Sequence, residues 1–230
     1  MKIKGLLSKK SILNKRECGL FIIKMKGKFI SFEGIEGCGK STQSKLLAAY
    51  LKENKSLNIR STREPGGPKI SEQIRNILLS IENEEMLPRT EALLYAAARS
   101  QHTGEWIIPE LRRGIWVISD RYFDSTTAYQ GDARGLSIKS LEMLTNFATY
   151  NTKPDLTILV DLPAEIGLSR INPGEADRIE KEAIEFHRKV RKGFLRIANE
   201  EPERIYVVDG KLGIEEIHKK IIKEVNRRYF

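Results

Sequence analysis

The sequence has few of the residues that build metal centres and disulfide frameworks. Its two cysteines, Cys18 and Cys38, form no C-x-x-C pair, and its three histidines, His102, His187 and His218, lie far apart. Isolated histidines lack the spacing of metal ligands, so we expect surface or packing roles for all three, and two such cysteines exclude a disulfide framework. No apolar run approaches the roughly 18 residues that a membrane-spanning helix needs. These absences favour a protein of the reducing cytoplasm without a membrane partner.

Acidic residues are almost absent from the first 28 positions, which hold nine Lys or Arg and one acid, Glu17. The rest of the chain has 31 Lys or Arg against 30 Asp or Glu, so the net charge of +9 belongs mainly to this segment. We therefore expect no nucleic-acid-binding face on the folded part. We expect residues 1–27 to form a disordered basic extension. A transit peptide and an unused upstream start, with Met25 as the true start, are the alternatives.

From residue 28 to residue 230, short apolar runs alternate with helical patterns, which suits one large domain. Such alternation predicts an α/β fold of the P-loop NTPase type: a three-layer sandwich with a five-stranded parallel sheet between helices. The predicted strands are 28–34, 57–63, 115–120, 156–162 and 204–210. The predicted helices are 40–53, 70–79, 89–113 with a bend at Pro109, 137–150, 179–200 and the C-terminal stretch.

The segment "GIEGCGKS" matches the phosphate-loop pattern G-x-x-x-x-G-K-[ST] between a predicted strand and a predicted helix. Glycines let successive backbone N–H groups point at phosphate oxygens, and the following helix N-terminus adds positive potential. Lys40 is placed to reach the β- and γ-phosphates of ATP, and the Ser41 hydroxyl to bind Mg²⁺. The predicted nucleotide-binding residues are Gly34, Ile35, Glu36, Gly37, Cys38, Gly39, Lys40, Ser41 and Thr42.

The phosphate loop alone does not name the reaction. The N-K-x-D sequence that GTPases use for guanine is missing, and the strand at 115–120 ends in "SDRY" rather than in the Asp-Glu of a motor ATPase. Two other classes stay open. One is a kinase for a nucleoside monophosphate or deoxynucleoside, and the other is a nucleotide-dependent regulator that uses the basic extension.

Four further motifs follow the phosphate loop in order: "REPGG" at 63–67, "YAAARSQH" at 95–102, "DRYFDSTTAYQG" at 120–131 and "DRIE" at 177–180. Together with the loop they closely resemble the thymidylate kinases, a family of P-loop nucleoside-monophosphate kinases. The resemblance covers about residue 28 to the C-terminus. It implies transfer of the ATP γ-phosphoryl group to dTMP with Mg²⁺, on the route to dTTP, by a homodimer.

The resemblance also implies residue roles. Tyr95 would stack on thymine and Arg99, one helical turn later, would hydrogen-bond the thymine edge; plain helix packing and a surface ion pair are the alternatives. Glu36 would accept a hydrogen bond from the sugar 3′-hydroxyl near Mg²⁺, unless it simply faces solvent. Arg63 and Arg121 would approach the phosphates, with Arg121 catalytic. The remaining substrate residues implied are Pro65, at a chain bend that suits a cis bond, Ser125, Thr126, Tyr129 and Gln130.

One departure from the family concerns its extra catalytic arginine, which stands either in the phosphate loop or in a lid. The loop position here is Gly37, and the segment 170–178, "RINPGEADR", has arginines only at its ends. We therefore expect Arg170 and Lys40 to neutralise the transferring group, with 170–178 as a lid rather than an ordinary surface loop.

Overall fold

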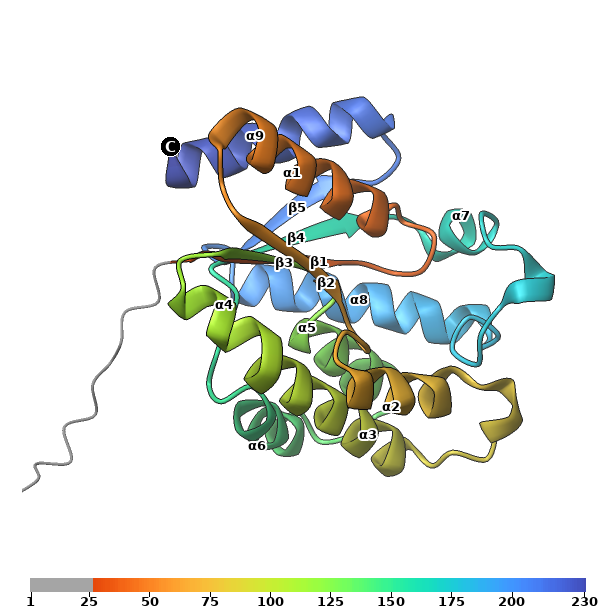
Figure 1. Cartoon of the computed structure of the whole chain (residues 1–230). Coiled ribbons are helices and arrows are strands. Elements are labelled where there is room, and N and C mark those ends of the chain that lie inside the picture. Colours follow the sequence, from red (N-terminus) through yellow and green to blue (C-terminus); the bar gives the residue numbers. More distant parts are fainter. Residues whose placement is uncertain (1–26) are drawn as a thin grey trace, which may run out of the picture.

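A five-stranded parallel sheet forms the centre of the molecule (Figure 1). The structure is a computed structural model that describes residues 27–230. The strand order is β2-β3-β1-β4-β5, and β1 and β4 are almost completely buried because both faces carry helices. The predicted α/β sandwich is confirmed. The strands are β1 (Phe29–Glu33), β2 (Ile59–Arg63), β3 (Trp116–Asp120), β4 (Leu156–Asp161) and β5 (Ile205–Asp209).

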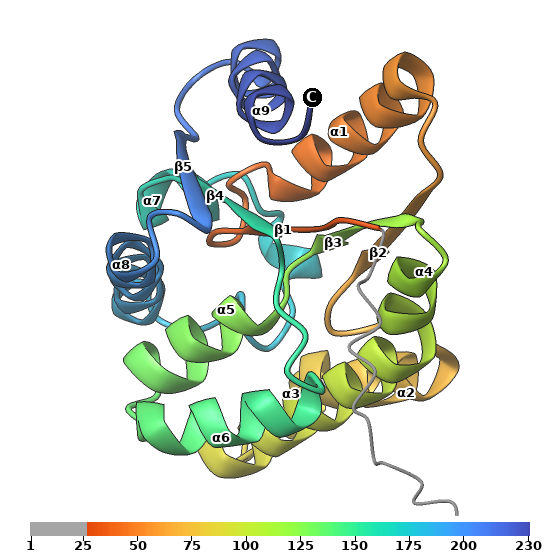
Figure 2. The same cartoon turned by 90° about the vertical axis from the view of Figure 1, so that its left-hand side faces the viewer.

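Helices cover both faces of the sheet, with a further group outside them (Figure 2). One face carries α1 (Lys40–Lys55) and α9 (Ile214–Tyr229). The other carries α4 (Ile108–Arg112), α5 (Phe123–Thr126) and α8 (Ile184–Glu200). The outer group contains α2 (Lys69–Leu79), α3 (Pro88–His102) and α6 (Ile138–Ala148). Shorter helical segments are η1 (Ile81–Asn83), η2 (Thr103–Ile107), η3 (Thr127–Ala133), α7 (Ala164–Leu168) and η4 (Pro173–Glu175).

The long helical region predicted for 89–113 is present but changes its winding. Helix α3 passes through a π-helical turn, η2, before α4 begins. Pro109 follows this turn, and it has no N–H to donate to the carbonyl four residues earlier, so the regular hydrogen-bond ladder breaks here.

Two predictions differ from the structure. The helix predicted from residue 179 begins only at Ile184, because the Asp177 carboxylate accepts hydrogen bonds from the N–H groups of Ile179 and Glu180 and holds them in a turn. Residues 123–133 form α5 and η3, although no helix was expected there.

The predicted basic extension, including Met25, lies outside the described residues except for Gly27. The Gly27 N–H donates to the Leu111 carbonyl at 3.0 Å, so Gly27 is in contact with the folded part of the chain. No helix in the described part of the chain has the length and apolar character needed to cross a bilayer.

Candidate active site

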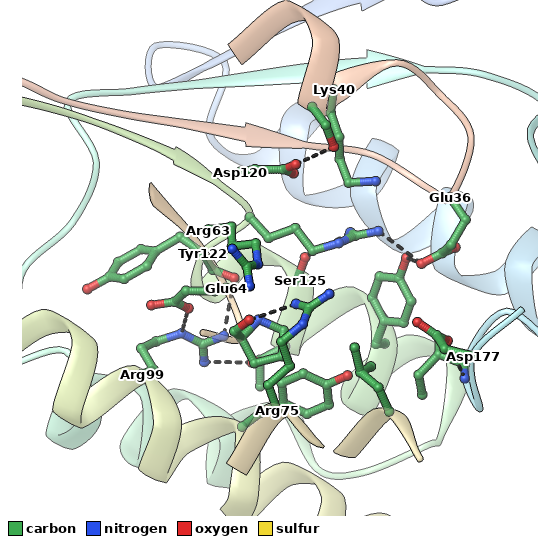
Figure 3. Close-up of a pocket in the computed structure, with 18 of the residues that line it drawn as sticks. Glu36, Lys40, Arg63, Glu64, Arg75, Arg99, Asp120, Tyr122, Ser125 and Asp177 are labelled. Atoms are coloured by element: carbon green, nitrogen blue, oxygen red, sulfur yellow. Dashed lines mark hydrogen bonds and ion pairs between the residues drawn. The ribbon is translucent and has the colours of Figure 1, made fainter. Parts of the chain in front are cut away.

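The carboxyl ends of β1, β2 and β3 open into a cavity of about 260 Å³ (Figure 3). Ligands of open parallel sheets collect at this edge. The cavity brings together most of the side chains predicted to bind substrates. These are Glu36, Lys40, Ser41, Arg63, Pro65, Tyr95, Arg99, Arg121, Ser125, Thr126, Tyr129 and Gln130.

The phosphate loop has the backbone shape that its motif requires. Gly37 and Gly39 have φ angles of +68° and +94°, which L side chains rarely adopt. Lys40 begins α1 and its ammonium donates to the Ile35 carbonyl at 3.2 Å, so the side chain folds back across the loop. The Cys38 side chain is buried in the hydrophobic core, and this residue offers the loop only its backbone.

Ser41 and Asp120 provide oxygen atoms suited to a divalent cation. The Ser41 hydroxyl donates to Asp120 Oδ2, and the other carboxylate oxygen, Oδ1, is buried without a hydrogen-bond partner among the described residues. Hydroxyl and carboxylate oxygens are the ligands that Mg²⁺ prefers, and the orphaned oxygen fits such an ion. Residues 27–230 contain no cluster of three or more His, Cys, Asp or Glu that could form an all-protein metal site.

Glu36 is held by three side chains and does not face solvent. Its Oε1 accepts from Arg121 Nη2 at 2.9 Å and from the Tyr129 hydroxyl, while Oε2 lies 3.1 Å from His187 Nδ1. Burial would raise the pKa of Glu36, but the charge of Arg121, the His187 contact and the charge of Lys40 lower it below its usual range. The carboxylate is therefore ionised, and both of its oxygens have protein partners.

Arg121 occupies a strained position between the loop and the cavity. Its φ of +71° lies in the left-handed region, which costs on the order of 1–3 kcal/mol for a residue other than glycine. Its Nη1 donates to the Gly34 carbonyl at 2.9 Å and to Ser125 Oγ at 3.2 Å, and its guanidinium lies 5.1 Å from the Tyr129 ring centre. These contacts offset the strain and aim a permanent positive charge into the cavity.

Arg99 is buried rather than part of a surface ion pair. Its Nε donates to Glu64 at 2.7 Å, and its Nη1 donates to Thr126 Oγ1 at 2.7 Å. A third N–H donates to the Tyr122 carbonyl, which leaves two of the five guanidinium N–H groups without a partner in the part of the chain that the structure describes. Glu64 also lies 2.9 Å from His102 Nδ1, so Arg99, Glu64 and His102 form a buried polar chain beside the cavity.

Pro65 and Tyr95 both line the cavity. The Glu64–Pro65 peptide bond is cis, and Pro65 lines the cavity. Tyr95 is only half-buried and lines the same space, so part of its side chain is accessible from the cavity.

Comparisons with known proteins agree with this geometry. The sequence model of the thymidylate kinase family matches residues 32–221. The chain belongs to the thymidylate kinase family. It is 52% identical over 198 residues to the thymidylate kinase of Carboxydothermus hydrogenoformans, covering 86% of this chain and 96% of that protein. It is 46% identical over 207 residues to that of Lactobacillus acidophilus, covering 89% and 96%.

A solved structure of the family has the same fold. The crystal structure of thymidylate kinase from Ehrlichia chaffeensis matches with a TM-score of 0.71 at 34% identity, over 86% of this chain and 98% of that one. The resemblance inferred from the motifs is thereby confirmed.

The two arginines that flank the predicted lid, residues 170–178, have different surroundings. Arg170 is exposed and its Nη1 donates to the Gly37 carbonyl of the phosphate loop at 3.0 Å. Arg178 is buried, with Nη2 2.7 Å from Glu91 Oε2 and Nε donating to the Leu78 carbonyl. Of these two arginines, only Arg170 contacts the phosphate loop; that it acts in the transfer stays a prediction.

Sequence reasoning missed several side chains of the thymidylate kinase site. Arg75 lines the cavity, donates to the Pro65 carbonyl at 2.7 Å and has its pKa lowered by burial and by the neighbouring Arg63. His187, expected in a packing role, is buried but also contacts Glu36. Glu64 lay inside the quoted "REPGG" motif and Asp120 at the start of "DRYF", so both could have been found; nothing local marks Arg75 or His187.

Proposed function

We propose that this cavity is where the protein, a dTMP kinase, transfers the γ-phosphoryl group of ATP to dTMP, giving dTDP and ADP on the route to dTTP. An oxygen of the dTMP 5′-phosphate forms a bond to the γ-phosphorus while the bond to the ADP oxygen breaks. The transfer needs positioning and positive charge rather than a covalent intermediate. The observation that carries the proposal is that the phosphate loop and a second group of arginines open into one cavity.

The donor end of the cavity lies at Lys40 and Asp120 (Figure 3). Loop N–H groups and Lys40 hold the ATP phosphates, and Arg170 approaches from the lid, residues 170–178. We assign Mg²⁺ to Ser41 and Asp120 rather than to Glu36, because Asp120 Oδ1 has no hydrogen-bond partner among the described residues, whereas the Glu36 carboxylate is already paired with the Arg121 guanidinium. When bound, Mg²⁺ supplies positive charge to the donor phosphates.

The acceptor end lies at Arg99 and Arg75 (Figure 3). Arg121, Arg63 and Arg75 surround the dTMP phosphate. The two unpartnered N–H groups of Arg99 suit a thymine carbonyl, and Tyr95 stacks on the ring.

The sugar lies between the two ends. Glu36 accepts from the 3′-hydroxyl, and the buried Tyr129 leaves little room for a 2′-hydroxyl, which favours deoxyribose. The walls around sugar and base are completed by Ser125, Thr126 and Gln130, of which Gln130 is fixed by donating to Glu91 at 2.9 Å.

Residues 28–230 form the catalytic domain, and we infer that it acts in the cytoplasm as a homodimer. Helices α3 and α6 expose Leu93 at 59%, Met143 at 61% and Phe147 at 82% of their surfaces. The two helices pack against each other in the outer group, and we infer that these exposed side chains belong to one apolar face. A second copy of the chain would cover it by two-fold symmetry.

The test is the reaction itself. Purified protein is incubated with ATP, MgCl₂ and dTMP, and nucleotides are separated by chromatography. We expect dTDP and ADP in equal amounts, and Arg121→Ala to lower kcat by roughly 100-fold because charge stabilisation is lost. ADP without dTDP, or near-normal kcat in Arg121→Ala, would contradict the proposal.

A further inference from the structure

The phosphate loop touches helix α7 through two glycines. A Cβ placed on Gly37 would lie 2.0 Å from the Gly167 carbonyl oxygen, and a Cβ on Gly167 would lie 2.4 Å from the Glu36 carbonyl oxygen. Both distances are far below van der Waals contact, and the atoms met are backbone, which has no rotamer to change. Loop and helix therefore approach as closely as they do only because neither glycine has a side chain.

This contact explains why the loop has no arginine. Any side chain at position 37 would enter the space that the α7 backbone fills, and the φ of +68° disfavours every residue other than glycine. An arginine is found instead at position 170, two residues after α7, the helix whose backbone fills the space beside Gly37. The Arg170 N–H donates to the Gly167 carbonyl at 3.1 Å, and its guanidinium donates to the Gly37 carbonyl at 3.0 Å.

The close contact with the phosphate loop explains why position 167 is occupied by glycine. It lies within α7 and has no left-handed φ, so its helical backbone would accept alanine, which is the better helix former. The end of a flexible side chain, Ile35 Cδ1, is the second atom that a new Cβ would meet, at 2.9 Å, and it can move aside. The Glu36 carbonyl cannot move without displacing the phosphate loop.

We propose that Gly167 is a positioning residue for the transfer reaction: by lacking a side chain, it seats α7 on the phosphate loop and so holds Arg170 beside the donor phosphates. The proposal rests on the donor-side role of Arg170 given above. It predicts that a single methyl group at position 167 separates the loop from the lid and slows transfer, while the acceptor end of the cavity keeps its shape.

The test uses Gly167→Ala with Glu165→Ala as control. Glu165 lies on the same helix and its contact is an exposed ion pair with Arg188. We expect Gly167→Ala to lower kcat by roughly 10- to 100-fold, as a displacement near 1 Å does. Calorimetric dTMP affinity should stay within about twofold of wild type, and Glu165→Ala should leave both values unchanged. A normal kcat, or an equal loss of dTMP affinity, would overturn the proposal.

A double variant shows whether Gly167 acts through Arg170. We expect Arg170→Ala to be slow and Gly167→Ala/Arg170→Ala to be slower by less than about threefold, because the two changes remove one interaction. Full additivity of the two losses would overturn the link to Arg170. Failure of the wild-type protein to form dTDP would instead contradict the proposed function, so the two failures are distinguishable.

Discussion

The imidazole Nδ1 of His187 lies 3.1 Å from Oε2 of Glu36 and joins α8 to the phosphate loop across 151 positions of sequence. The other oxygen of Glu36 is held by Arg121 and Tyr129. An acidic side chain in a loop that binds anions is therefore already balanced by a guanidinium and fixed in direction. In the proposed reaction this carboxylate serves the acceptor, by accepting from the sugar 3′-hydroxyl, rather than the donor phosphates.

Replacement of His187 tests this arrangement. We expect His187→Leu to raise the KM for dTMP by about tenfold, because a buried charged group loses a hydrogen-bond partner. The KM for ATP should change little. His187→Asn, whose side-chain amide reaches the place of Nδ1, should recover most of the loss. Equal effects of the two variants in steady-state kinetics would show that His187 serves packing only.

Replacement of Tyr95 tests the proposed contact with the thymine base. Removing the ring in Tyr95→Ala should raise the KM for dTMP about tenfold and change kcat less, since stacking acts on substrate and transition state alike. Tyr95→Phe retains the ring and serves as the control with near-normal kinetics. An unchanged KM in Tyr95→Ala would remove Tyr95 from the acceptor site.

The buried Glu33 predicts a dependence of stability on pH. Burial and the charge of Asp124 raise its pKa to about 8, although the Tyr122 N–H donates to it at 2.8 Å. The folded state therefore holds a proton that the unfolded chain releases near pH 4.5, so the free energy of unfolding falls as pH rises from about 4.5 to 8.

Glu33→Gln should flatten this dependence, because the amide cannot ionise. The measurement is urea unfolding of both proteins at pH 6 and pH 9. The wild-type protein should lose more stability than the variant between these values. An identical loss in the two proteins would show that Glu33 is ionised throughout.

The apolar face of α3 and α6 predicts the oligomeric state. Phe147→Glu places a charge at an apolar side chain that is 82% exposed, and we expect sedimentation velocity to show a monomer where the wild-type protein shows a dimer. Ile214→Glu, at 59% exposure on α9, is the control and should leave the dimer intact. A monomeric wild-type protein, or a dimeric Phe147→Glu variant, would contradict this interface.

The sequence was most informative where contacts are local. The phosphate loop and the strands follow from spacing within one segment of the sequence, whereas the roles of Tyr95 and Arg99 are implied only by the family resemblance and stay predictions. His187 and Gly167 act through contacts between elements far apart in sequence, so no local pattern marks them. The helical pattern predicts that α8 begins at residue 179. The helix begins later because the N–H groups of Ile179 and Glu180 donate to the Asp177 side chain, which the periodic pattern does not reveal.

The central claim is that Tyr95, Arg99 and Tyr129 select a thymidine monophosphate. The most direct measurement is kcat/KM with Mg-ATP for dTMP, dUMP, dCMP, dGMP and UMP on the purified protein. The arrangement predicts the highest value for dTMP, with dCMP and dGMP lower because their base edges differ and UMP lower because of its 2′-hydroxyl. A higher kcat/KM for any monophosphate other than dTMP would contradict it.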